Sequence, residues 1–153
     1  MKKILIILLF ILVYSCSSEK PNSVQGNAPV LSFYLAAEKG EQGIMFKHLS
    51  PGRKMSVKLK NTPELVLFKN NIKQSDFSKK SFGLAIKFNL DNKSANKFSM
   101  ITMKNINKKL FVVFNNTVIV GPVIREQIKD GKIMISLANS DIKVYEKLKQ
   151  ILK

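Results

Sequence analysis

The sequence predicts an α+β fold, with a mostly antiparallel sheet and two helices packed on one face. Two observations lead to this prediction. Short runs of β-branched and aromatic residues recur between turn residues along most of the chain, which is typical of strands. Residues 91–107 and 139–153 instead repeat apolar side chains every three or four positions, the period of an amphipathic helix. The chain has 153 residues, 45% of them hydrophobic, which is enough for the core of one domain.

The clearest strand pattern lies within residues 110–120. Two apolar runs flank Asn115 and Asn116, and asparagine tolerates a positive φ better than any residue except glycine. A two-residue hairpin turn therefore fits between the runs. Gly121 and Pro122 then end the second strand, because proline cannot donate to a ladder and glycine lets the chain bend.

A second hairpin is predicted directly afterwards. Residues 123–129 and 132–137 are two further strand-like runs, and Asp130 and Gly131 stand between them. Asp-Gly between apolar runs is among the strongest short-range hairpin signals. We interpret all of these turn residues as backbone devices and not as a site.

The other elements are predicted from the same two patterns. Apolar or alternating runs predict strands at residues 30–37, 55–60, 64–68 and 82–90. Polar composition and scattered turn residues predict loops at residues 38–51 and 70–80, the second with at most one helical turn. Asp91 or Asn92 is expected to cap the first helix, and residues 139–141 to start the second.

The charge of the chain is unusual. Its formal net charge is +16, and Arg53 and Arg125 are the only arginines among 26 basic residues. One interpretation is a lysine-rich codon usage without functional meaning. The other is attraction to an anionic membrane, a wall polymer or a nucleic acid. The shortage of arginine weighs against nucleic acid, since bidentate contacts to bases and phosphates favour arginine.

The N-terminus has the pattern of an export signal. Two lysines precede an apolar run at residues 4–13, which is too short to span a bilayer but suits a signal peptide. The sequence Val13-Tyr14-Ser15-Cys16 resembles the cleavage site of bacterial lipoproteins. That resemblance implies removal of residues 1–15 and attachment of lipid to Cys16. The formal charge would then fall to +14, since Lys2 and Lys3 are removed.

Cys16 is the only cysteine of the chain, so it has no partner for an internal disulfide. Lipidation explains this solitary thiol, and an uncleaved N-terminal anchor with an incidental cysteine is the alternative. Residues 16–29 are rich in Ser, Asn, Pro and Gly and are interpreted as a flexible tether. Residues 30–153 would form the domain, held to a bacterial membrane and facing the periplasm or the exterior.

No catalytic constellation is visible in the sequence. His48 is the only histidine and falls in a predicted loop, without a second histidine or a nearby cysteine for a metal site. The ten acidic residues are scattered, and Asp91 suits a helix cap better than acid–base chemistry. We therefore expect no enzyme activity, no catalytic residues, no cofactor and no metal.

From residue 82 onward the elements follow a distinctive order. They are a strand, a helix containing NKFSMITMKN, the strand-turn-strand KKLFVVFNNTVIV, Gly121-Pro122, the turn at Asp130-Gly131, the strand KIMISL and a closing helix. This order resembles the head subdomain of the periplasmic P1 loop of SecD. Earlier residues resemble single-domain relatives less strongly. The resemblance implies a SecD P1 head-like fold over residues 30–153.

Three functional hypotheses are open at this point. The first is a lipid-anchored binding module that contacts an exported or translocon-associated polypeptide, for which an exposed strand edge would suffice. The second is an enzyme, for which little speaks. The third is a basic protein that binds an anionic surface or polymer. SecD couples export to a proton gradient through transmembrane helices. This sequence contains no run of 18 apolar residues that could form such a helix, so the resemblance does not extend to that motor.

Overall fold

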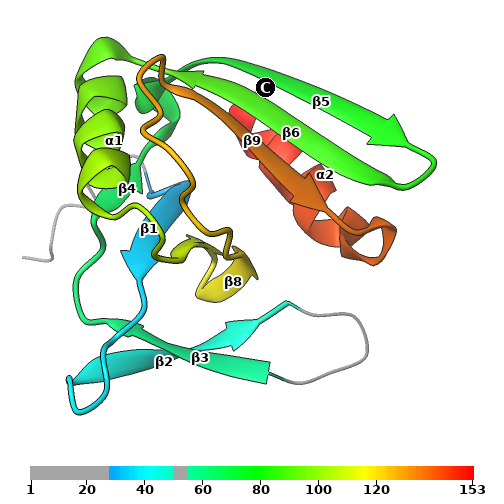
Figure 1. Ribbon diagram of the computed structural model, residues 1–153. Helices are drawn as coiled ribbons and strands as arrows, with labels where there is room; N and C mark the ends of the chain where they lie inside the picture. Colours follow the sequence, from blue (N-terminus) through cyan, green and yellow to red (C-terminus); the bar gives the residue numbers. More distant parts are fainter. Residues whose placement is uncertain (1–27, 50–54) are drawn as a thin grey trace, which may run out of the picture.

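The computed structural model describes residues 28–49 and 55–153 (Figure 1). The predicted signal peptide, Cys16 and nearly all of the predicted tether lie outside these residues. In chain order the elements are β1 (Leu31–Leu35), β2 (Gly43–His48), β3 (Met55–Lys60), β4 (Leu65–Leu67), the 3₁₀ turn η1 (Lys69–Asn71), β5 (Ile72–Lys80), β6 (Gly83–Leu90), α1 (Asn92–Lys104), β7 (Leu110–Phe114), β8 (Thr117–Val120), β9 (Lys132–Leu137), the 3₁₀ turn η2 (Asn139–Asp141) and α2 (Ile142–Leu152).

The strands form two sheets. The larger sheet has the order β3-β2-β8-β7-β1-β4, and the smaller has the order β5-β6-β9. Neighbouring strands are antiparallel, except that β2 runs parallel to β8. Both helices pack against β6 of the smaller sheet. The predicted class, α+β with mainly antiparallel strands and two helices, is confirmed, although the strands are divided between two sheets.

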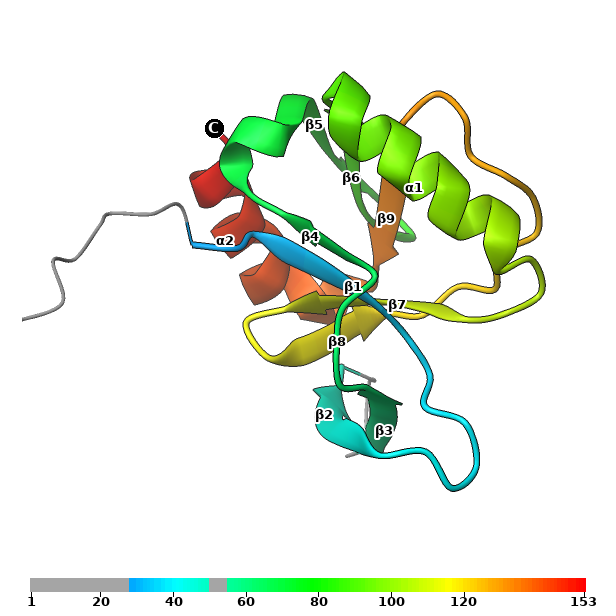
Figure 2. The same cartoon turned by 90° about the vertical axis from the view of Figure 1, so that its left-hand side faces the viewer.

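The main core lies between the two sheets and the two helices (Figures 1 and 2). Alternate residues of β6 point into it, as expected for a strand with one face in water. Buried side chains from β6 and from both helices meet there, among them Ile86, Phe88, Phe98, Tyr145 and Leu148. Burial of each such side chain contributes about 1.5–3 kcal/mol to folding.

β7 lies between β8 and β1 inside the larger sheet and is buried along its whole length, because both of its faces are covered. Phe111 and Val113 point into a second, smaller cluster that includes side chains of β2 and β3. The alternate residues of β7 point into the main core. The hairpin predicted after β7 is present, and its turn residues Asn115 and Asn116 have φ angles of 45° and 57°.

The second predicted hairpin is wrong. Residues 123–131 form no strand, and β9 pairs with β6 instead of with them. The amide of Ile124 donates to the carbonyl of Lys108, and the amide of Asn107 donates to the carbonyl of Ile124. The segment therefore bonds to the connection between α1 and β7. Gly131 has a φ of 65°, but a β-carbon there would lie 2.5 Å from the β-carbon of Ala95, so close packing on α1 also requires this glycine.

Two predicted loops contain strands. β2 lies within residues 38–51, and its central residue Phe46 is buried in the second cluster while its neighbours are largely exposed. β5 occupies most of residues 70–80, where a polar composition predicted a loop. Its full length is paired with β6, with a bulge near Gln74. In both cases pairing with a neighbouring strand stabilises a strand that the local sequence does not predict.

The first helix begins as predicted. Asp91 is the N-cap of α1, and its Oδ1 accepts a 2.7 Å hydrogen bond from the amide of Ser94. The other carboxylate oxygen accepts a 2.9 Å hydrogen bond from the side-chain amide of Asn71. The first of these bonds is the main cause that lowers the pKa of Asp91 below its ordinary value of 3.8. Residues 139–141, predicted to start the second helix, form η2 instead, and α2 begins at Ile142 without a side-chain cap from Asp141.

Candidate polypeptide-binding groove

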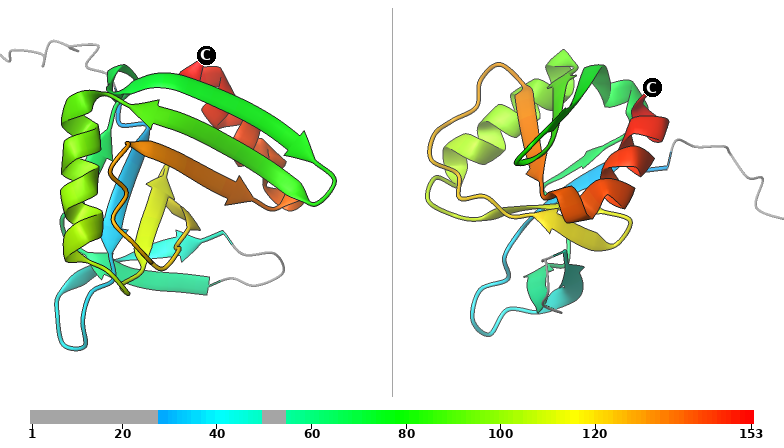
Figure 3. Two further views of the ribbon diagram at one scale, coloured as in Figure 1. Left: turned by 45° about the horizontal axis from the view of Figure 1, so that its top comes forward. Right: turned by 90° about the vertical axis from the view of Figure 1, so that its right-hand side faces the viewer.

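β9 is the outermost strand of the smaller sheet on the side of β8 (Figure 3, left). In an antiparallel pair, every second residue directs its amide and carbonyl toward the neighbouring strand. The amide of Leu90 in β6 donates to the carbonyl of Gly131, so residue 131 is one of those that face β6. Residues 133, 135 and 137 therefore direct their main-chain groups toward β6, and residues 132, 134 and 136 direct theirs away from it. The amide of Lys132 accordingly bonds to the Asp130 side chain and not to β6.

The outward main-chain groups of Met134 and Ser136 form the free edge of β9. Among the described residues, no backbone or side-chain group forms a hydrogen bond with either amide. Met134 is 62% exposed, so its apolar side chain is accessible beside this edge. An unpaired edge with an apolar side chain is suited to pairing with another extended chain.

A groove of about 280 Å³ runs beside this edge. β9 forms one side, and residues 121–128 form the other. The apolar side chains that line it from the two sides include Pro122, Val123, Ile124, Ile128, Ile133 and Met134. Phe98 and Thr102 of α1 also line the groove, together with residues of β1, β7 and β8. The groove thus combines main-chain hydrogen-bonding groups with an apolar surface.

Three contacts hold the wall that faces β9. The amide of Ile128 donates a 3.0 Å hydrogen bond to the hydroxyl of Thr102, which is only 1% exposed. The Gln127 side-chain amide donates a 2.9 Å bond to Ser99, and the amide of Leu110 donates to the carbonyl of Pro122. Because residues 121–128 form these bonds with α1 and with the first residue of β7, they leave the edge of β9 free.

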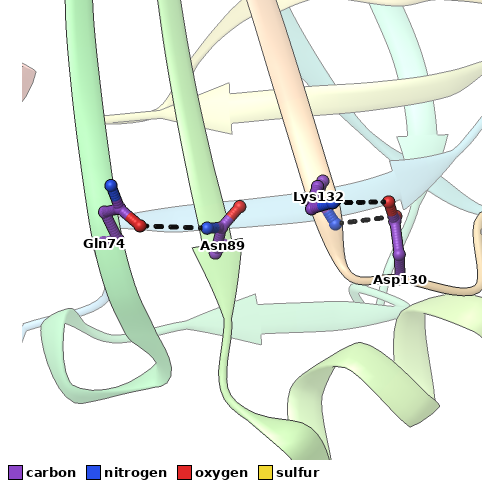
Figure 4. Close-up of polar contacts among 4 residues, drawn as sticks. All are labelled: Gln74, Asn89, Asp130 and Lys132. Carbon is purple, nitrogen blue, oxygen red and sulfur yellow. Dashed lines mark hydrogen bonds and ion pairs between the residues drawn. The ribbon is translucent and has the colours of Figure 1, made fainter.

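Charged groups lie at one end of the groove. Lys132 Nζ is 3.5 Å from Asp130 Oδ2, and the Lys132 amide donates a 3.1 Å bond to Asp130 Oδ1 (Figure 4). The amide contact is the main cause that lowers the pKa of Asp130. Arg125 and Glu126 also line the groove. On the adjoining strands Asn89 donates to Gln74, so the outer face of the sheet is polar at this end (Figure 4).

The other three sheet edges are less suited to an added strand. β4 has three residues and packs against α1. Part of β3 is occupied, because the amide of Ala37 donates to the carbonyl of Lys58. β5 carries several charged residues, including Lys79, whose Nζ lies 2.7 Å from Glu146. Charged side chains on an edge strand discourage pairing with other chains.

The residues singled out in the sequence are distributed unevenly around this groove. Pro122 lines it, and Asp130 lies at its charged end. Gly121 packs so closely on the ring of Phe111 that a β-carbon would lie 2.5 Å from it. Asn115 and Asn116 form the β7–β8 turn and do not line the groove.

Sequence reasoning missed the residues that build the groove. Thr102 lies in the helix predicted over residues 91–107, and Met134 in the second strand of the hairpin predicted over residues 123–137. The sequence KIMISL alternates between Lys132, Met134 and Ser136, which are exposed, and apolar residues, which are buried. This alternation is the only feature of the sequence that points to the strand beside the groove. It indicates a strand with one face in water, but it does not indicate which of its edges is free.

The described residues contain no cluster of side chains suited to binding a metal ion. Within residues 28–49 and 55–153, no three His, Cys, Asp or Glu residues lie close enough to hold a metal ion. His48 pairs through its backbone with Val118 at the β2–β8 contact. None of the helices in this part of the chain has the length and apolarity needed to cross a membrane.

Comparison with known proteins agrees with this architecture. No curated protein matches the chain. A solved structure of SecDF, a membrane component that enhances protein export, is 20% identical with a TM-score of 0.60, and the match covers 83% of this chain and 63% of that one. A crystal structure of SecDF in its super-membrane-facing form is also 20% identical, with a TM-score of 0.61, and the match covers 83% of this chain and 19% of that one.

These two likenesses concern the fold, and the chain spans less than two thirds of either SecDF chain. A separate comparison identifies the family. The family model of the SecDF P1 head subdomain matches residues 47–146, which is more than half of the sequence. That range contains β3 to β9, both walls of the groove and α1. The chain therefore belongs to the SecDF P1 head subdomain family.

Proposed function

We propose that this protein is a lipid-anchored component of the bacterial cell envelope that binds extended segments of exported polypeptide. It uses the free edge of β9 and the adjoining groove. An incoming strand pairs with the main-chain groups of Met134 and Ser136 and places alternate side chains in the groove. This mode of binding is tolerant of sequence, because main-chain bonds supply much of the affinity.

The free edge of β9 is the observation that carries this proposal. Polypeptides in transit across a membrane are unfolded, so their main-chain donors and acceptors are available for pairing. Beside those groups the groove offers them a mostly apolar cavity with a volume of about 280 Å³. Membership of the SecDF P1 head family supports a link to protein export. The proposed role is binding and involves no catalysis.

The membrane anchor is a separate part of the proposal. It rests on the sequence around Cys16, which would carry lipid after removal of residues 1–15. Residues 16–29 would then act as a tether for the domain at residues 30–153. The domain would face the periplasm or the exterior, where exported chains emerge. Acyl chains give durable attachment when two or more are present, since each buried methylene contributes about 0.8 kcal/mol.

Photocrosslinking in cells tests the binding role. A photoreactive amino acid replaces Met134 in one strain and Lys143, an exposed residue of α2, in a matched control. Both strains export a reporter that folds slowly. We expect adducts to the reporter from position 134 and none from position 143. Equal yields from both positions, or no adduct from position 134 during active export, would contradict the proposal.

Mass spectrometry of the N-terminal peptide tests the anchor independently. We expect a peptide that begins at Cys16 and carries the mass of a diacylglycerol group. Cys16→Ser should abolish this species and release the domain from membranes unless residues 4–13 retain it. An unmodified Cys16 within an intact N-terminus would refute lipidation, while the crosslinking result would still decide the role of the groove.

A further inference from the structure

We infer that the outer face of α1 docks on an anionic lipid bilayer. This face consists of Lys93, Lys97, Met100, Met103 and Lys104, and it is called the α1 face below. All five residues are exposed, while Ser94, Phe98, Ile101 and Thr102 of the same helix are buried. This inference concerns a different surface from the groove and does not depend on what the groove binds.

The helical period brings the lysines of the α1 face together. Lys93, Lys97, Met100 and Lys104 are spaced by four, three and four residues, so they lie in one row along the helix. The helix of 13 residues is about 20 Å long. Three ammonium groups therefore lie along a single line on one side of the domain. Figure 2 shows α1 on the side of the domain turned toward the viewer.

The lysines of the α1 face have no anionic partner in the part of the chain that the structure describes. The ion pairs there are Lys79–Glu146 and Lys132–Asp130. From residue 92 to residue 125 the sequence contains no Asp or Glu. Asp91 lies at the start of the helix, but both of its carboxylate oxygens already accept hydrogen bonds. The α1 face is therefore positive without local compensation.

The positive surface continues beyond the end of α1. Lys108 and Lys109 are exposed and border a shallow hollow with Lys60. Glu38 borders the same hollow, so this part is partly compensated and the α1 face is the purely basic region. Lysines near an anionic leaflet are attracted to it over roughly a Debye length, about 8 Å at physiological salt.

Two exposed methionines indicate a bilayer as the partner. Met100 and Met103 are 51% and 48% exposed and lie beside the lysine row. Basic residues around exposed apolar side chains are typical of helices that lie at a membrane interface, where the apolar groups enter the boundary of the acyl chains. A soluble polyanion would attract the lysines equally well but would give the methionines no apolar environment.

Docking through the α1 face leaves the groove open. In Figure 1 α1 forms one side of the domain, and residues 121–131 run between it and β9. The side chains that α1 contributes to the groove, Phe98 and Thr102, are on its buried side. The free edge of β9 would therefore remain accessible while the α1 face contacts the membrane.

A fluorescent probe on the full chain tests this inference. Cys16→Ser removes the native thiol, and Met100→Cys carries an environment-sensitive dye. The chain is mixed with phosphatidylcholine vesicles with or without phosphatidylglycerol. We expect a blue shift and protection from an aqueous quencher only with phosphatidylglycerol. The same dye at Met134→Cys should not respond.

Two charge-matched triple variants identify the surface. Lys93→Gln, Lys97→Gln and Lys104→Gln together should lower the ratio of docked to undocked protein about a hundredfold, which corresponds to about fivefold per lysine. The control variant combines Lys143→Gln, Lys147→Gln and Lys153→Gln, which remove the same charge at two positions of α2 and at the residue after it. It should leave the ratio of docked to undocked protein nearly unchanged. Circular dichroism verifies that both variants fold.

Three results would overturn the inference. The first is an equal response of the probe on neutral and anionic vesicles, and the second is an equal loss in both triple variants. The third is an equal blue shift with heparin and no vesicles, which would assign the face to anionic polymers.

Discussion

The amide of Ile128 donates its hydrogen bond to the hydroxyl of Thr102, and this contact fixes the distance between the groove wall and α1. Thr102→Val keeps the shape of the side chain but leaves the amide of Ile128 without its partner. We expect a loss of about 1–3 kcal/mol in the free energy of unfolding. Thr102→Ser retains the hydroxyl and should lose less. Urea denaturation of the two variants measures the difference.

The Thr102 variants should also differ in polypeptide binding. If the wall moves in Thr102→Val, crosslinking from position 134 to an exported reporter should fall, while Thr102→Ser should retain it. Equal stability and equal crosslinking in the two variants would show that the Ile128–Thr102 bond does not hold the groove.

Met134→Pro is expected to remove binding without unfolding the domain. The amide of Met134 points away from β6, so its loss breaks no bond of the ladder, and proline is tolerated on edge strands. An added strand would lose this donor and meet the proline ring. Met134→Thr keeps the amide and should still bind. Thermal unfolding and reporter crosslinking from a probe at position 136 separate the two effects.

Gly131→Ala should destabilise the domain more than Gly40→Ala does. Both glycines have a positive φ, 65° and 88°, so alanine is strained at either position. At Gly40 a β-carbon has nothing within 4 Å, whereas at Gly131 it would lie 2.5 Å from the Ala95 β-carbon. We expect an additional loss of about 1–3 kcal/mol at Gly131. Similar losses at both positions would refute close packing between residue 131 and α1.

The cap of α1 should make stability depend on pH. The pKa of Asp91 is lowered in the folded protein, chiefly by the Ser94 amide and then by Asn71, so the unfolded chain binds the proton more tightly. The stabilisation is therefore present above the ordinary pKa of 3.8 and is lost as pH falls through the lower, folded value.

Asp91→Asn is the matched control for this prediction. Asparagine caps a helix about as well as aspartate but carries no charge. The difference in unfolding free energy between the wild type and this variant should therefore shrink as the solution becomes more acidic. Urea denaturation across a range of pH measures it. Parallel pH profiles would show that the Asp91 carboxylate does not contribute in this way.

The sequence predicts the strands whose signal is local. The apolar run of β7 is recognisable because both of its faces are buried, and the two asparagines after it fix the turn. α1 and α2 are recognisable from their period and from the cap at Asp91. The family resemblance, which rests on the order of these elements, agrees with the match over residues 47–146.

The missed features depend on partners that are distant in sequence. β5 is polar because one edge and one face are exposed, and its order comes from pairing with β6. The hairpin predicted at Asp130-Gly131 is absent for the same reason. Gly131 is required by its close approach to Ala95 of α1, and the strand that follows, β9, pairs with β6.

The groove is a further product of the tertiary structure. It is built from α1, β1, β7, β8, the segment after β8, and β9, which only the folded chain brings together. The sequence suggested that an exposed strand edge could bind polypeptide. It did not indicate that this edge belongs to β9, since that follows from which side of the strand β6 occupies.

Residue-resolved amide hydrogen exchange tests the central claim most directly. The full chain is measured alone and with an excess of an unfolded exported polypeptide. Pairing at the free edge should slow exchange at the amides of Met134 and Ser136, while the edge amides of β5 stay unchanged. Unaltered exchange at Met134 and Ser136 when the polypeptide is bound, or protection confined to β5, would contradict binding at β9.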